Sequence, residues 1–286
     1  LKTQATREIG VIVPNISNPS YAQLVQGIQS TAIHNDYHIL LYNSHRDGEM
    51  ESRNIRMMLE KRVDGILLVS IGGKRELADS ARRLNCRLIT IEQDRELGQA
   101  HVGYDYAKAG ELAAKHLIEN GHRRIAFLGA RLDRPSRARM LEGYRRALRG
   151  ADLPERAEYI YLSDAEEETG HFEIENGKSG AANLMRLAER PTGCVCLNDL
   201  TALGAMRAFA AAGLRVPEDV SIVGFDNIPF GELSTPRLTT IDQHAERMGQ
   251  IAVDMMIELI QNPDATPQSV ELEPELILRG SVQKIG

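Results

Sequence analysis

Acidic and amide side chains directly after a short apolar run are the residues of this sequence best suited to binding chemistry. Val220–Gly224 is rich in β-branched residues, which is typical of a strand covered on both faces, and Asp226 and Asn227 follow it. An open parallel sheet binds its ligands beyond the carboxyl ends of its strands. A carboxylate there accepts hydrogen bonds from neighbouring hydroxyl groups, which suits a polyol. We therefore predict that Asp226 binds a small polar ligand.

Two further segments place polar or aromatic side chains after apolar runs. Asn198 follows the run 193–197, and its amide can both donate to and accept from a ligand hydroxyl. Asp199 is expected instead to cap the helix that follows. Near the start of the chain, Tyr21 is as well placed to stack on a sugar or base ring as to pack against its own lobe, and both interpretations stay open.

Apolar strand patterns alternate with amphipathic helix patterns along almost the whole chain. Strands are predicted at residues 9–14, 37–42, 64–69, 88–91, 124–129, 159–162, 193–197 and 220–224, with an extended segment at 269–278. Helices are predicted from Pro19, with Asn18 as the cap, and at residues 49–61, 74–84, 106–120, 138–148, 176–188, 202–212 and 245–261. Such alternation requires right-handed crossovers and parallel sheets, and there are too many strands for one sheet. We predict an α/β fold of two doubly wound parallel-sheet lobes, with irregular stretches at residues 94–105 and 230–238.

Composition and motifs exclude several classes of protein. The net charge is −6, and no apolar stretch is long enough to span a membrane. The three cysteines, which cannot all pair, indicate a reducing compartment, so we expect a cytoplasmic protein. The basic cluster Arg131–Arg149 is expected to be a solvated helix face rather than a grip on DNA phosphates. Cys86, Cys194 and Cys196 are expected to be buried free thiols. With no nucleophile elbow, phosphate-binding loop or zinc spacing, we expect no enzyme, no cofactor and no metal.

The segment from Gly213 to Gln243 also resembles one protein family. Gly-Phe-Asp-Asn at residues 224–227 and Leu-Thr-Thr-Ile-Asp-Gln at residues 238–243 are similar to motifs of the LacI/GalR transcription regulators. The resemblance implies a periplasmic-binding-protein-like type I fold, in which the chain crosses three times between two lobes and the ligand lies in the cleft between them. It places a linker remnant at residues 1–7, an N-terminal lobe at 8–104 and 243–270, and a C-terminal lobe at 105–242 and 271–286.

Resemblance to the family motifs adds further candidate ligand-binding residues. Ser20 and Tyr21 match an Asn-Pro-aromatic-aromatic segment, with Ser20 in place of the first aromatic residue. Phe172, in Gly-His-Phe, matches an aromatic residue that flanks the ligand, although His171 replaces the acid of that motif. Asn198 and Asp226 match family residues at the ends of two strands.

Two segments depart from the family pattern. Met140 stands where the family has a ligand-binding arginine, and Arg139 comes one residue earlier, about 100° away around a helix. Arg134, Ser136 and Arg139 are therefore kept as candidate contacts. In the segment that matches a family Asp-Arg pair, Glu92 and Asp94 both remain candidates for the acid.

The resemblance implies the effector-binding and dimerisation part of a LacI-type regulator, without its helix-turn-helix domain. We expect a homodimer that binds a sugar, a sugar derivative or a nucleoside, and that reaches operator DNA only through the absent N-terminal domain. By itself the chain should not bind operator DNA. The alternative is a periplasmic sugar-binding protein of a transporter, which is built on the same fold and is usually a monomer.

Overall fold

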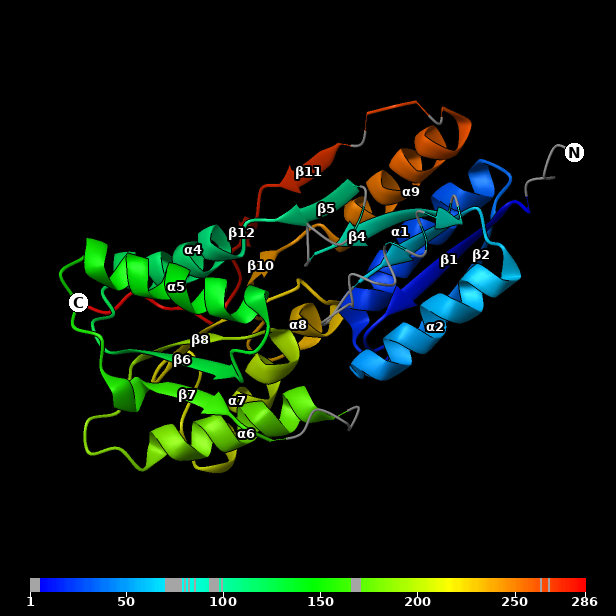
Figure 1. Cartoon of the computed structure of the whole chain (residues 1–286). Helices are drawn as coiled ribbons and strands as arrows, with labels where there is room; N and C mark the ends of the chain where they lie inside the picture. Colours follow the sequence, from blue (N-terminus) through cyan, green and yellow to red (C-terminus); the bar gives the residue numbers. More distant parts are fainter. Residues whose placement is uncertain are drawn as a thin grey trace, which may run out of the picture. The chain divides into compact units, whose positions relative to one another are not determined.

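A computed structural model of the chain describes residues 6–69, 79, 81, 83–84, 86–92, 98, 100–165, 171–262, 264–266 and 268–286. The chain forms two compact units. Unit 1 comprises Leu1–Tyr104 and His244–Leu272, and unit 2 comprises Asp105–Gln243 and Glu273–Gly286. Each unit contains one sheet with helices on both faces (Figure 1), which confirms the predicted α/β class. The predicted linker at residues 1–7 lies largely outside the described residues.

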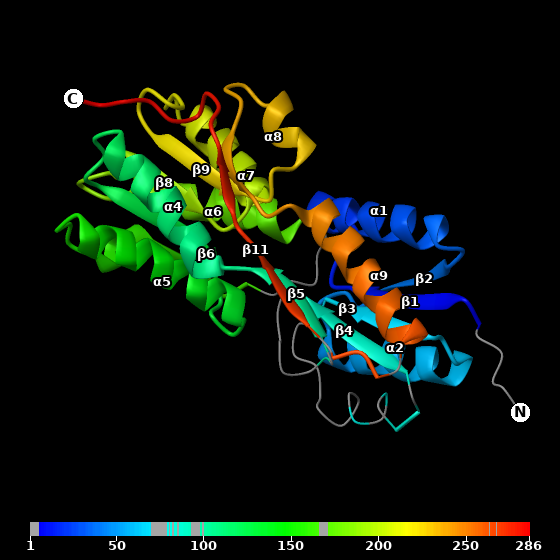
Figure 2. The same ribbon diagram turned by 90° about the horizontal axis from the view of Figure 1, so that it is seen from above.

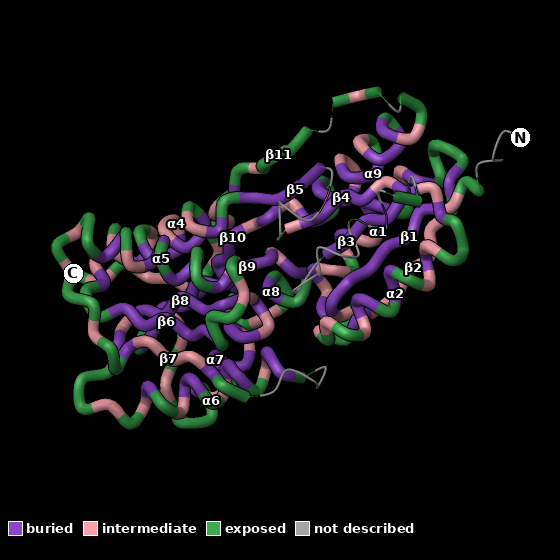
Figure 3. Tube along the Cα trace, viewed as in Figure 1, coloured by how far each residue is buried: buried purple, intermediate pink, exposed green. Residues whose placement is uncertain are grey.

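Unit 1 is built on a six-stranded sheet in the order β11-β5-β4-β3-β1-β2, and all of its neighbouring strands are parallel. Its strands are β1 (Glu8–Val13), β2 (His38–Asn43), β3 (Gly65–Leu68), β4 (Arg87–Ile91), β5 (Ala100–Tyr104) and β11 (Ser269–Leu272). The strand order reverses direction at β1, as in other doubly wound sheets. Figure 3 shows that the central strands are buried along their length.

Helices cover both faces of this sheet. They are α1 (Pro19–His34), α2 (Gly48–Lys61) and α9 (Ala245–Gln261). Helices α1 and α9 lie side by side on one face (Figure 2), and glycine allows their backbones to touch, because a Cβ on Gly27 would lie 2.0 Å from the carbonyl oxygen of Glu246. On the other face Met58 of α2 packs against Gly10. Asn18 caps α1 by accepting from the Ser20 N–H, as predicted.

Unit 2 contains a second six-stranded sheet, in the order β12-β10-β9-β8-β6-β7. Its strands are β6 (Ile125–Ala130), β7 (Ile160–Ser163), β8 (Gly193–Cys196), β9 (Ser221–Phe225), β10 (Thr239–Asp242) and β12 (Glu275–Ile277). This sheet is parallel except at one edge, where β12 pairs with β10 in the antiparallel direction. The extended segment predicted at residues 269–278 is in fact divided between the two units, as β11 and β12.

Paired helices enclose the unit 2 sheet. They are α4 (Tyr106–Glu119), α5 (Pro135–Gly150), α6 (Phe172–Met185) and α7 (Asp199–Ala211), with a short α8 (Pro229–Leu233) and a 3₁₀ turn at Ala157–Tyr159. Helices α6 and α7 bury apolar side chains of β6, β8 and β9 on one face, and α4 and α5 cover the other. Cys194 and Cys196 are buried free thiols in this core, and Cys86 is a buried free thiol in unit 1.

Parts of the element prediction were wrong. The stretch 94–105, predicted to be irregular, contains β5, and the stretch 230–238 contains most of α8. Strand β10 was not predicted at all. Most of the helix predicted at residues 74–84 lies outside the described residues. Across the part of the chain that the structure describes, no helix has both the length and the apolar character needed to cross a membrane.

Candidate functional site

Predicted binding residues of unit 2 gather at one edge of its sheet, where the parallel strands have their carboxyl ends. Arg134 precedes α5 and Ser136 lies in its first turn, whereas Phe172 is the first residue of α6. Asn198 follows β8, and Asp226 follows β9, the strand next to it. Adjacent parallel strands bring the residues after them close together, so Asn198 and Asp226 are neighbours at this edge.

Asp226 lies in a strained and well-anchored turn. Its φ is 102°, and that of Asn227 is 51°, in a region that residues other than glycine seldom adopt. The Asp226 N–H donates to the carbonyl oxygen of Ile241 at 2.9 Å. The side-chain amide of Gln243 donates to Asp226 Oδ1, and only 8% of Asp226 is exposed. Strain of this kind persists only where the surroundings hold the backbone in place.

Asp199 supplies much of that support, and the prediction that it caps α7 is wrong. It is fully buried, its Oδ2 accepts the Ile228 N–H at 2.9 Å, and its Oδ1 accepts the Thr240 hydroxyl at 2.6 Å. These two bonds tie the start of α7 to the residues after β9 and to β10. A Cβ on Gly224 would lie 2.2 Å from Asp199 Oδ1, so the carboxylate needs a glycine beneath it.

Burial also changes the acidity of this carboxyl group. Loss of hydration raises the pKa of Asp199 to about 7, although the bonds from Thr240 and Ile228 and the positive charge of Arg279 oppose the rise. The negative charge of Asp242 adds to it. Asp199 therefore changes its protonation state near neutral pH.

Asn198, rather than Asp199, is the cap of α7. Its side-chain oxygen accepts the Thr201 N–H at 2.9 Å. This bond uses the oxygen that we predicted to accept from a ligand hydroxyl, and it leaves the side-chain NH₂ as the group able to donate to a ligand. Capping thereby fixes the direction in which that amide donor points.

Arg279 braces the same turn from the segment after β12. Its Nη2 donates to Asn227 Oδ1 at 2.7 Å, and its Nη1 donates to the carbonyl oxygen of Leu238 at 2.9 Å. The Asn227 amide in turn donates to Asp242 Oδ2 at 3.1 Å. Sequence analysis missed Gln243 and Arg279 as supports of Asp226, because their importance comes from contacts between strands that are distant in sequence.

The other candidates of unit 2 differ in burial. Phe172 is buried, with 4% of its surface exposed, and Arg134 and Ser136 are partly buried. Arg139 is exposed, whereas Met140 beside it is buried in the core. Sequence analysis also passed over Glu173, an acid with 2% exposure in the first turn of α6. Its position next to Phe172 was the signal that would have found it.

In unit 1 the candidates also lie at the carboxyl ends of strands. Ser20 is buried and Tyr21 is partly buried in the first turn of α1, which follows β1. Glu92 follows β4 with a φ of 67°, and its N–H donates to the carbonyl oxygen of Val102 at 2.8 Å. Asp94, the alternative acid, lies outside the described residues.

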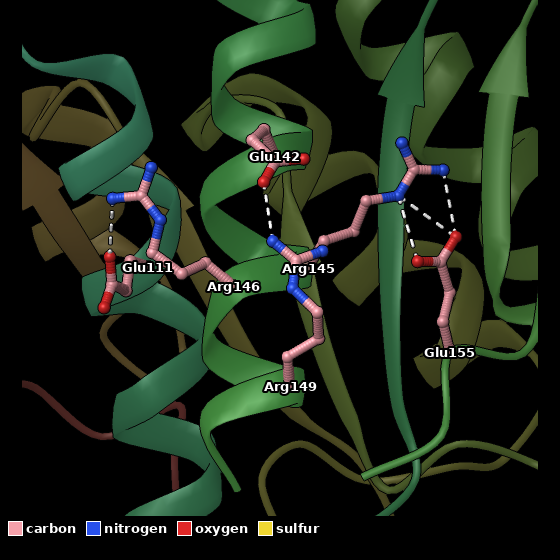
Figure 4. Close-up of polar contacts among 6 residues, drawn as sticks. All are labelled: Glu111, Glu142, Arg145, Arg146, Arg149 and Glu155. Atoms are coloured by element: carbon pink, nitrogen blue, oxygen red, sulfur yellow. Dashed lines mark hydrogen bonds and ion pairs between the residues drawn. The ribbon is translucent and has the colours of Figure 1, made fainter. Parts of the chain in front are cut away.

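The basic cluster on α5 is largely neutralised by carboxylates (Figure 4). Arg145 binds both carboxylate oxygens of Glu155, at distances of 2.9–3.0 Å. Arg146 pairs with Glu111 of α4 at 3.2 Å, and Arg149 pairs with Glu142 at 2.6 Å. Guanidinium groups held in this way are poorly suited to phosphate binding. Within the described ranges no three His, Cys, Asp or Glu side chains are grouped so as to hold a metal ion.

Comparison with known proteins supplies the family. Residues 114–282 match the family described as the periplasmic binding protein-like domain. The HTH-type transcriptional repressor PurR of Mannheimia succiniciproducens is 32% identical over 290 residues, which cover 100% of this chain and 84% of the repressor. PurR of Actinobacillus pleuropneumoniae is 34% identical over 294 residues, with the same shares covered. A LacI family transcriptional regulator from Enterococcus faecium, solved with bound ribose, superposes with a TM-score of 0.86 at 27% identity, over 98% of this chain and 100% of that one.

The chain belongs to the LacI family of transcriptional regulators.

Membership of the LacI family confirms the resemblance drawn from the segment 213–243. The chain is the effector-binding part of such a regulator, and its two α/β sheets match those of the LacI-family structures. A periplasmic binding protein of a transporter, the alternative raised by the sequence, is not favoured, because the relatives are transcriptional repressors.

Proposed function

We propose that this LacI-family chain binds a small polar effector through residues at the carboxyl ends of its strands. The candidate contacts in unit 2 are Arg134, Ser136, Arg139, Phe172, Asn198 and Asp226. Those in unit 1 are Ser20, Tyr21, Glu92 and Asp94. Asp226 carries the proposal, because a strained backbone braced by buried hydrogen bonds is the usual sign of a functional residue.

The chemistry of these side chains favours an effector with hydroxyl groups and a ring. Asp226 accepts from hydroxyls, the Asn198 amide donates to them, and Phe172 offers an aromatic surface. A sugar, a sugar derivative or a nucleoside has both features. The ribose bound by the Enterococcus faecium regulator supports the same class of ligand.

A thermal-shift screen of sugars, sugar phosphates and nucleosides tests this proposal. An effector at about 100 times its Kd should raise the free energy of unfolding by about 2.7 kcal/mol. Asp226→Ala should remove the shift, and Asp254→Ala, an exposed aspartate on α9, should retain it. A full shift with Asp226→Ala would remove Asp226 from the binding site.

The remaining properties follow from the family and are part of the proposal. The protein acts in the cytoplasm as a homodimer without catalytic activity, and effector binding controls operator DNA binding by an N-terminal helix-turn-helix domain. The repressor relatives support this role. Sedimentation equilibrium tests the dimer, and a mass of one chain at micromolar concentration would contradict it.

A further inference from the structure

A cavity lies at the opposite edge of the unit 2 sheet from Asp226. Its lining includes Arg124, Thr192 and Val220, which directly precede β6, β8 and β9, so the cavity lies at the amino ends of these strands. Its volume of about 380 Å³ falls within the range of small-molecule sites. The α7 helix, 13 residues long, separates it by about 20 Å from the residues at the carboxyl edge.

Apolar side chains of the core form one wall of this cavity. Met185 and Leu214, which are partly buried and packed against the core, offer accessible apolar surface in the lining, whereas Leu184, Phe209 and Val220 are each at most 3% exposed. Leu184 and Phe209 belong to α6 and α7, which pack so closely that a Cβ on Gly204 would lie 2.2 Å from the carbonyl oxygen of Ile174. This tight packing gives Met185 and Leu214 a rigid support, so the apolar wall is preformed and the cost of ordering on binding is low.

Charged side chains form the rest of the lining, and its carboxylates already have partners. Glu189 binds Arg156 at 2.6 Å, and this bond holds the pKa of Glu189 below its ordinary value. Asp219 accepts the Arg215 N–H at 2.8 Å, which lowers the pKa of Asp219 in the same way. Both groups are therefore ionised and engaged at neutral pH.

Two arginines of the lining are not hydrogen-bonded to a carboxylate of the described residues. Arg124 uses its Nε to donate to the carbonyl oxygen of Arg190 at 2.9 Å, and among the described residues neither Arg124 nor Arg190 forms an ion pair. The charge of Arg124 also acts on Glu189, and that of Arg190 acts on Asp219. Together with Arg156 and Arg215, however, there are four guanidinium groups for these two carboxylates, so the cavity has an excess of positive charge. A preformed apolar wall beside two available guanidinium groups matches an organic anion with an apolar body.

We propose that this cavity is a second small-molecule site, distinct from the effector site, which binds an aromatic or aliphatic carboxylate. The carboxylate contacts Arg124 and Arg190, and the apolar body lies against Met185 and Leu214. Guanidinium groups bind carboxylates with directed, charge-assisted hydrogen bonds, which gives selectivity over a neutral molecule of the same shape.

Binding of 1-naphthaleneacetate to the purified chain tests the proposal. The chain contains no tryptophan, so the naphthalene fluorescence anisotropy can be read without a tryptophan background. We expect saturable binding to one site, at least about tenfold tighter than that of the neutral 1-naphthaleneacetamide, because only the carboxylate pairs with the arginines. Absence of saturation at millimolar probe, or equal affinity for the two probes, would overturn the proposal.

Matched variants locate the bound probe. Replacing Arg124 and Arg190 together by glutamine should weaken binding at least about tenfold, since the charge-assisted bonds are lost. The control replaces Arg186 and Arg207 together by glutamine. These are two exposed arginines of the same unit outside the lining, so the affinity for the probe should stay within about twofold of the original. Equal effects of the two double variants would show a general charge effect and overturn the assignment.

A variant that fills the cavity gives an independent test of where the probe binds. Ala188 lines the cavity and is exposed, so Ala188→Phe fills space without entering the core. Binding should be lost while the melting temperature stays close to that of the original chain. Unchanged affinity in Ala188→Phe would place the probe elsewhere and overturn the proposal.

Discussion

The carboxyl edge of the unit 2 sheet and the outer face of α5 are both rich in charged contacts, but they differ in what surrounds those contacts. Asp199 is fully buried and accepts two hydrogen bonds that join α7, β9 and β10. Arg145 and Glu155 form a bidentate ion pair, yet their side chains remain 35% and 40% exposed. Water therefore competes for the second set of contacts and not for the first.

This difference decides which contacts shape the protein. A buried donor left without an acceptor costs its full desolvation energy, whereas an exposed ion pair contributes little beyond what water provides. The buried contacts hold Asp226 and Asn227 in a strained turn, and the exposed ones pair arginines of α5 with carboxylates at the surface. The same kinds of side chain thus fix the backbone in one region and form only weak surface contacts in the other.

Removal of the buried carboxylate should destabilise the fold strongly. Asp199→Ala leaves the Ile228 N–H and the Thr240 hydroxyl without their acceptor, and we expect the free energy of unfolding to fall by about 3 kcal/mol. Urea denaturation measures the change. The control Asp254→Ala should cost less than about 0.5 kcal/mol, and a similar cost for both variants would remove the contrast between buried and exposed carboxylates.

The protonation of Asp199 should make the stability depend strongly on pH. Its pKa of about 7 lies above that of an unfolded chain, so the native state holds a proton that the unfolded state loses above about pH 4. The stabilisation is complete below about pH 4 and falls by about 1.4 kcal/mol per pH unit until about pH 7.

The variant Asp199→Asn isolates the part of the stability that depends on protonation of Asp199. The difference in unfolding free energy between the original chain and Asp199→Asn should decrease as the pH rises through this window and then level off. Arg279 and Asp242, the charges that act on Asp199, are present in both proteins, so their effects largely cancel. A difference that does not vary with pH would mean that Asp199 ionises at its ordinary pKa.

The same substitution in the two regions sharpens the comparison. Arg279→Gln removes the bonds to Asn227 and Leu238, and should lower the free energy of unfolding by about 2 kcal/mol. Arg145→Gln removes a bidentate pair on α5, and should cost less than about 1 kcal/mol. Chemical denaturation of the two variants ranks the sites, and the reverse order would contradict our interpretation.

The smallest expected difference between the two regions is in how salt changes the cost of a substitution. Raising the salt concentration from about 0.05 M to about 0.5 M should reduce the cost of Arg145→Gln by a few tenths of a kcal/mol, because exposed pairs are screened. The cost of Asp199→Ala should not change within error. An equal salt dependence would indicate that water reaches Asp199.

Much of the fold was predictable because its signals are local. Asn18 caps α1 and Gly213 takes a φ of 78° after α7, and both are properties of single residues and their chain neighbours. Strands β5 and β10 were missed for a different reason. Their sequences, Ala-His-Val-Gly-Tyr and Thr-Thr-Ile-Asp, carry weak apolar patterns, and pairing with adjacent strands decides their conformation.

The candidate site was predictable in position but not in its connections. Asp226 and Asn198 could be placed after strands from the sequence, because the ends of parallel strands share one edge. The exchange of roles between Asn198 and Asp199 was not predictable, since both residue types cap helices. Only the hydrogen bonds from Ile228 and Thr240, which exist in the folded structure, show that Asp199 is the buried residue and Asn198 the cap.

By itself, the sequence determined the alternating α/β pattern, the LacI-type motifs and the placement of Asp226 at the end of a strand. The tertiary structure alone decided that Asp199, Gln243 and Arg279 support the Asp226 turn. It also decided that residues from 124 to 220 enclose a cavity at the other end of the same sheet. Local propensities act over a few residues, whereas burial and hydrogen bonding join segments far apart in the chain and exist only once the sheet has formed.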